Sequence, residues 1–128
     1  MNLIVDNIQW IMLVAGLLTL TLLQAVVAPA AAMRSLFQTD VEQGPLQLIV
    51  RSWGLVICLT ALFLLYAAFI DPSMRTPAIA LSAIGKLHFV FMVFAAGVRF
   101  ADGQAFMAAI IDAIIVVLFA LYLIATLF

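Results

Sequence analysis

The sequence predicts an all-α integral membrane protein, a four-helix bundle that forms one domain, and three observations lead to this fold class. Hydrophobic residues make up 69% of the 128 residues and charged residues only 9%, whereas a soluble domain is about half apolar and a quarter charged. The apolar residues fall into stretches long enough to cross a bilayer, for which about 20 residues suffice. Short polar segments separate these stretches. Within lipid, a helix satisfies the backbone of each stretch internally.

Four spans are expected, and together they make a single transmembrane domain over residues 1–128. The helices are predicted at about 8–33, 46–70, 77–98 and 105–128. In the first span, small residues around Pro29 are spaced as at a signal-peptidase site. A signal peptide begins with a positively charged region, but no lysine or arginine precedes Arg34 and Asp6 is acidic. We therefore expect this segment to be retained as a membrane helix.

Turn chemistry marks the ends of the later spans. Pro45 and Pro77 suit the first turn of a helix, where the missing N–H has no intrahelical partner to lose. The polar segment 71–76 separates the second span from the third, and Asp102-Gly103 is a strong turn signal before the fourth.

Each span carries a polar side chain at a similar depth. Counted from the side of the first and third loops at about 1.5 Å per residue, Gln24, Arg51, His88 and Asp112 lie roughly 9 to 16 Å deep, and Lys86 about 20 Å. A charge at such depth costs about 2.5 to more than 10 kcal/mol, so these groups usually face the bundle interior and pair. We expect an Arg51–Asp112 ion pair between the second and fourth spans, with Lys86 as the rival partner of Asp112.

Lys86 and His88 are two residues apart, which places them about 200° apart around a helix. One is expected to face the bundle and the other a groove, a partner or the headgroup layer. Structural interpretations stay open beside these. Arg51 and Lys86 are long enough to snorkel towards the headgroups, and His88 and Gln24 are both used as interhelical hydrogen bonders in membranes. Asp112 in an ion pair can also serve packing alone.

Several kinds of chemistry are not supported by the residues present. One histidine is too few for a typical haem or zinc site. The single Cys58 permits no internal disulfide, and a net charge of −1 gives no basic field for nucleic acid. Phosphate-loop and dinucleotide fingerprints are absent. We expect no catalytic residue, no metal, no cofactor and no nucleic-acid partner.

The predicted function is therefore non-enzymatic: a membrane protein that binds a hydrophobic or lipid-like molecule, such as a lipid, a quinone or a sterol. Apolar walls would hold its tail and a few polar groups its head. The candidate ligand-binding residues are Arg51, Lys86, His88, Asp112 and Gln24. Two alternatives stay open, namely an accessory subunit of a larger membrane complex and an oligomeric, proton-coupled transporter that uses His88 and Asp112.

Three segments carry a resemblance: Arg51–Arg75, Gly85–Phe89, and the end of the chain with Asp112, Phe119 and Tyr122. In these segments the chain resembles small four-helix bacterial membrane proteins, loosely the DoxX-like group. The resemblance implies a helix bundle in the bacterial inner (cytoplasmic) membrane, sometimes as a partner of redox enzymes. This chain has only one cysteine and one histidine, which puts a redox role in doubt.

Overall fold

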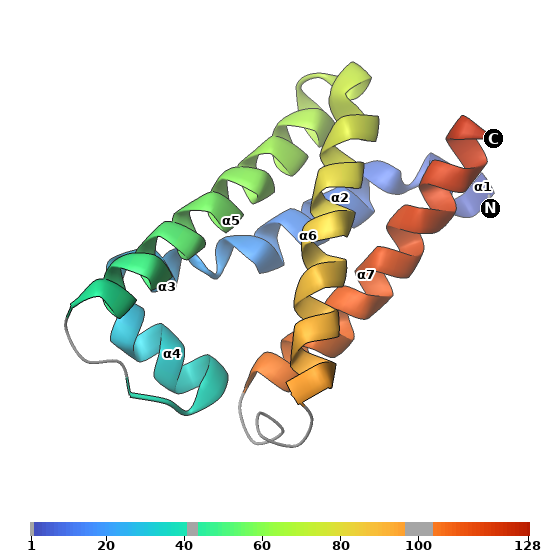
Figure 1. Ribbon diagram of the computed structural model, residues 1–128. Coiled ribbons are helices and arrows are strands. Elements are labelled where there is room, and N and C mark those ends of the chain that lie inside the picture. The colour runs from blue at the N-terminus through green and yellow to red at the C-terminus, as the bar shows by residue number, and fades with distance from the viewer. Residues whose placement is uncertain (1, 41–43, 97–103) are drawn as a thin grey trace.

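The computed structural model describes residues 2–40, 44–96 and 104–128, which form a bundle of α-helices (Figure 1). The elements are α1 (Asn2–Asp6), α2 (Ile8–Leu20), α3 (Leu23–Val27), α4 (Pro29–Phe37), α5 (Pro45–Phe69), the 3₁₀ turn η1 (Pro72–Met74), α6 (Arg75–Ala96) and α7 (Gln104–Leu127). Within the described ranges, four segments are long and apolar enough to cross a membrane: Ile8–Val27, Pro45–Phe69, Pro72–Ala95 and Gln104–Leu127. The protein is thus an all-α, multi-pass membrane protein.

The second and fourth spans begin and end close to the residues that the sequence predicts, and the third span begins close to its predicted start. α5 and α7 each start one residue before the expected position and end one residue early. α6 starts at Arg75, two residues before the expected Pro77, so that this proline still lies in the first turn. The end expected at Val98 lies outside the described residues. Pro45 takes the first position of α5, directly after Gly44, whose φ of 137° favours glycine.

The first span departs from expectation, because a single helix over 8–33 is wrong. α4 begins at Pro29, which has no N–H to donate to the preceding turn. Proline also disfavours helical geometry in the residue before it, and Ala28 has a φ of −138° and a ψ of 73°. The helix therefore breaks at Ala28, and α4 leaves the bundle in a new direction (Figure 1).

A second break separates α2 from α3 at Thr21 and Leu22. The Thr21 hydroxyl donates to the carbonyl of Leu18 over 2.6 Å, and the Thr21 backbone N–H bonds the same carbonyl over 3.3 Å. Threonine hydroxyls that bond nearby carbonyls compete with regular helical bonding and bend helices. The first span is consequently a bent element rather than a straight rod.

The main apolar core lies in the half of the bundle that contains the chain termini and the α5–α6 turn; we refer to it as the packed half. It combines buried side chains from α2, α5, α6 and α7 around the fully buried Phe119. Its buried members are Ile8, Met12, Ala15, Leu64, Ala67, Ala68, Ala78, Ile79, Ile115, Phe119 and Tyr122.

Two contacts hold α5 against its neighbours, one with α3 and one with α6. A Cβ on Gly54 of α5 would lie 2.8 Å from the Ala25 Cβ of α3, so only glycine permits this approach. At the other end of α5, the Arg75 side chain of α6 donates to the carbonyls of Ala67 and Ala68 over 3.3 and 2.8 Å. These carbonyls belong to the last turn of α5, which has no intrahelical donors for them. From this contact α5 and α6 diverge towards the opposite end of the bundle (Figure 1).

Candidate functional site

The diverging helices border a partly open cavity of about 960 Å³ in the half of the bundle opposite the packed half. We call this the open half. Side chains from α2, α5, α6 and α7 line the cavity, and Leu36 of α4 is also part of the lining. Most lining residues are apolar, including Trp53, Ile57 and Phe89. The polar side chains in the lining are Thr19, Thr21, Thr60, Ser82, Lys86, Gln104 and Asp112.

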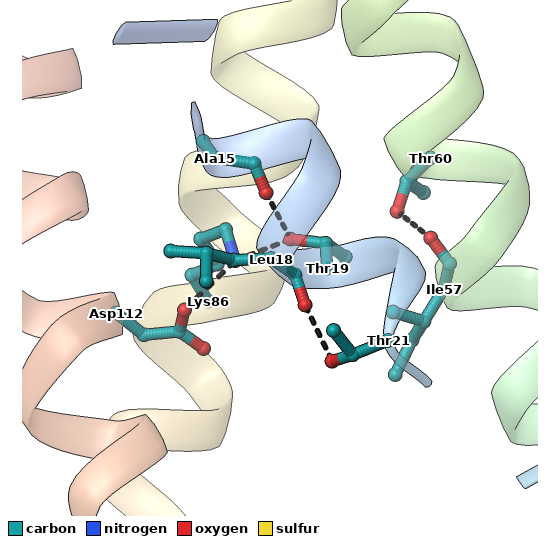
Figure 2. Close-up of polar contacts among 8 residues, drawn as sticks. All are labelled: Ala15, Leu18, Thr19, Thr21, Ile57, Thr60, Lys86 and Asp112. Atoms are coloured by element: carbon teal, nitrogen blue, oxygen red, sulfur yellow. Dashed lines mark hydrogen bonds and ion pairs between the residues drawn. The ribbon is translucent and has the colours of Figure 1, made fainter. Parts of the chain in front are cut away.

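An ion pair forms the polar centre of the cavity wall (Figure 2). The Lys86 Nζ lies 2.8 Å from the Asp112 Oδ1 and also donates to the Thr19 Oγ1 over 2.9 Å. The Thr19 hydroxyl in turn donates to the carbonyl of Ala15 over 2.7 Å. Lys86 is 8% exposed. The pair therefore links α6 to α7 and, through the threonine, to the backbone of α2.

Helical periodicity puts both charged residues on inward faces. Residues three and four apart lie on one helix face. On α7 the buried residues Ala105, Ala109, Ile115 and Phe119 follow this spacing, and Asp112 occupies the same stripe. On α6, the buried Ser82 precedes Lys86 by one turn. The Lys86–Asp112 pair, with Ser82 one turn away, thus interrupts a largely apolar interior surface.

The expected Arg51–Asp112 pair is wrong, and the rival pairing with Lys86 is the one observed. The buried face of α5 runs through Val50, Gly54 and Cys58, and a residue next to Val50 is rotated about 100° away from it. Arg51 is accordingly exposed and does not line the cavity. It forms no ion pair with any residue in the described part of the chain.

His88 and Gln24 also lie outside the cavity. Both side chains are exposed on the outer surface of the bundle, on α6 and α3 respectively. The expectation that Lys86 and His88 face different directions is confirmed, because Lys86 is buried. A proton path that uses both His88 and Asp112 has no geometric support within this cavity. Of the five candidate residues, the structure brings Lys86 and Asp112 together.

Thr19 and Gly85 are parts of the site that the sequence reasoning missed. Thr19 accepts a hydrogen bond from the Lys86 ammonium. Threonine hydroxyls bond to their own helix so readily that a threonine in a span gives little indication of a binding site. Gly85 lines the cavity one residue before Lys86, and a Cβ added there would meet no atom within 4 Å. The available signal in the sequence was that Gly85 directly precedes Lys86 within an apolar span.

The site presents an ion pair within an apolar surface. Lys86 and Asp112 supply one donor group and one acceptor group, and the surrounding surface is apolar. No cluster of three histidine, cysteine or acidic side chains suited to a metal occurs among residues 2–40, 44–96 and 104–128. Comparison with known proteins finds no family model, no curated protein and no solved structure that matches this chain.

Proposed function

We propose that this protein binds a hydrophobic, lipid-like molecule in the cavity of the open half, with the polar head of the molecule at the Lys86–Asp112 pair. The observation that carries the proposal is the cavity itself, which joins an apolar surface to one ion pair. Ligand sites are concave, mostly apolar and have few, well-placed polar groups. Their volumes run from roughly 300 to 1,000 Å³, and about 960 Å³ lies near the upper limit.

The rim of the cavity supports entry from the bilayer. Val56 on α5 and Leu81 and Ile84 on α6 line the cavity, and 59%, 50% and 69% of their respective surfaces are exposed. In a membrane-spanning bundle such exposed apolar side chains contact lipid. A hydrophobic molecule could thus move from the bilayer into the cavity without crossing water. We propose the bacterial cytoplasmic membrane as the location of this function, a proposal that rests on the resemblance to DoxX-like proteins alone.

A native mass measurement tests the proposal. The protein would be extracted from its own membrane in a mild detergent and measured beside two α6 variants. Gly85→Phe places a ring in the cavity, where a Cβ meets open space. Leu87→Phe is the matched control, since Leu87 is 56% exposed and does not line the cavity.

We expect a bound small molecule on the native protein and on the Leu87→Phe variant, but not on the Gly85→Phe variant. Equal retention by both variants would show that the molecule binds elsewhere. Absence of any bound or exchangeable lipid from the native protein, including after reconstitution with added lipids, would overturn the proposal.

A second candidate function has one observation in its favour. His88, Arg51 and Gln24 are exposed polar side chains on membrane-spanning segments. Polar groups within the bilayer are costly when they face lipid, so a protein partner that covers them would stabilise the assembly. The corresponding proposal is an accessory subunit of a larger membrane complex. The same mass measurement tests it, because a larger co-purifying assembly supports it and a lone chain opposes it.

A further inference from the structure

We infer that the cavity selects a ligand whose polar head is uncharged and both donates and accepts a hydrogen bond, such as the hydroxyl of a long-chain alcohol or acylglycerol. This inference rests on the proposed function and names the ligand class of the same site. It follows from the charge of the cavity wall and from the hydrogen-bonding groups that are left unused there.

The charges of the cavity wall cancel. Among the described residues that line the cavity, the charged ones are Lys86 and Asp112, and they neutralise each other over 2.8 Å. Arg51, which would have made the site cationic, lies outside it. An anionic or cationic head would therefore enter a poorly solvated space with no opposite charge left over. The desolvation of an unmatched charge is unfavourable, so the site disfavours both kinds of head.

The unused hydrogen-bonding groups lie close together. An ammonium group has three donors, and Lys86 uses two of them on Asp112 and Thr19. A carboxylate has two acceptor oxygens, and only the Oδ1 of Asp112 is engaged by a described residue. The hydroxyl of Ser82, one helical turn before Lys86, also has no hydrogen-bond partner within the described residues. The wall thus offers a donor and an acceptor side by side.

The threonines add acceptors but no donors. The hydroxyls of Thr21 and Thr60 donate to the carbonyls of Leu18 and Ile57, over 2.6 Å in both cases (Figure 2). Their single hydroxyl hydrogens are thereby used, while their oxygens keep acceptor capacity. A phosphate or carboxylate needs several converging donors, and neither threonine supplies one. The donors that remain in the lining are the third Lys86 hydrogen, the Ser82 hydroxyl, the Gln104 amide and the Trp53 indole N–H. A hydroxyl head matches the set better, because it gives one hydrogen bond and accepts another.

The test compares three probes that have the same chain and different heads: oleyl alcohol, oleate and oleylamine. Their binding to the delipidated protein in detergent at neutral pH would be measured by calorimetry and by the shift in thermal unfolding. We expect oleyl alcohol to bind at least tenfold more tightly than oleate or oleylamine. Equal or tighter binding of a charged probe would overturn this inference and leave the proposed function intact. Binding of none of the three would overturn the proposed function itself, and this inference with it.

Two substitutions reverse the preference if the charge argument holds. Asp112→Asn leaves the Lys86 ammonium unmatched and should shift the preference towards oleate. Lys86→Met leaves the Asp112 carboxylate unmatched and should shift it towards oleylamine. Unchanged ranking in folded variants would contradict the inference.

Ser82→Ala keeps the pair and removes only the free hydroxyl. It should weaken oleyl alcohol binding by about twofold to tenfold, the range for one hydrogen bond. No loss would remove Ser82 from the site. Should either charge variant fail to fold, the probe ranking on the native protein still decides.

Discussion

The packed half and the open half are built from the same long helices, yet they differ in what the helices present to one another. In the packed half, α5 and α6 meet through Ala67, Ala68, Ala78 and Ile79, which are at most 2% exposed. In the open half, α6 presents Ser82, Gly85 and Lys86 to a cavity. The short connection between α5 and α6, held by Arg75, brings the helices together at one end only. The difference teaches that one end of the bundle supplies the buried core and the other leaves an open cavity.

The largest expected effect on stability comes from replacing one phenylalanine in each half of the bundle. Phe119→Ala in the packed half removes a fully buried ring and should lower the free energy of unfolding by about 3 to 5 kcal/mol. Phe89→Ala, in the cavity lining, removes a ring that already borders open space and should cost less than half as much. Unfolding in detergent or bicelles measures both. Equal losses would show that the open half is packed as tightly as the other.

The next effect concerns the ion pair. Lys86→Met or Asp112→Asn alone leaves one charge unmatched and should destabilise the protein by about 2 to 3 kcal/mol, below the full value for a buried pair because the site borders a cavity. The double variant should recover most of this loss, since it leaves no charge behind. A double-mutant cycle on the unfolding free energies measures the coupling. Additive losses would mean that the pair is not formed.

Substitution of Gly54 or of Gly85 should change the stability by smaller amounts and with opposite signs. A Cβ at Gly54 would lie 2.8 Å from the Ala25 Cβ and 3.2 Å from the Leu22 carbonyl oxygen, so Gly54→Ala should cost about 1 to 3 kcal/mol. Gly85→Ala meets no atom within 4 Å and should stabilise α6 by about 0.5 to 1 kcal/mol. Thermal unfolding of the two variants gives the signs. Destabilisation by Gly85→Ala would show that the cavity is filled at that point.

The smallest effect is expected on the outer surface. His88→Leu replaces an exposed polar side chain on a membrane span by an apolar one, and exposed substitutions usually change stability by at most about 0.5 kcal/mol. Unfolding of the isolated protein should therefore hardly change. If His88 meets a protein partner, recovery of that partner in a pull-down should fall while stability holds. A large loss of stability would place His88 in the interior.

Sequence reasoning reaches most of this fold because hydropathy alone defines a membrane span. The bounds of α5 and α7 follow from where apolar residues begin and end. The breaks in the first span were missed because its apolar character continues through them, although Pro29 was a visible signal. Hydropathy reports the solvent around a segment and not the local hydrogen bonds that bend it.

Sequence reasoning placed the candidate residues at similar depths in the membrane but did not predict which way their side chains face. Counting residues placed Arg51, Lys86 and Asp112 in one layer, but a pair also requires that both side chains face inward. The buried small residues Gly54 and Cys58 mark the inward face of α5 and leave Arg51 off it. This spacing was readable in the sequence, whereas the contact between Lys86 and Thr19 depends on how α2 crosses α6.

The contact between Arg75 and the end of α5 fixes one end of α6, so that any tilt of this helix relative to α5 would pivot there. Arg75 holds the first residue of this helix to the carbonyls of Ala67 and Ala68, so the fulcrum lies at that end. With 22 residues and a rise of about 1.5 Å each, the arm is roughly 33 Å long. A tilt of about 10° would then carry the far end through about 6 Å, more than the width of an acyl chain. A rotation at the arginine would change the width of the gap between α5 and α6, and the bonds from Lys86 to Asp112 and Thr19 oppose it.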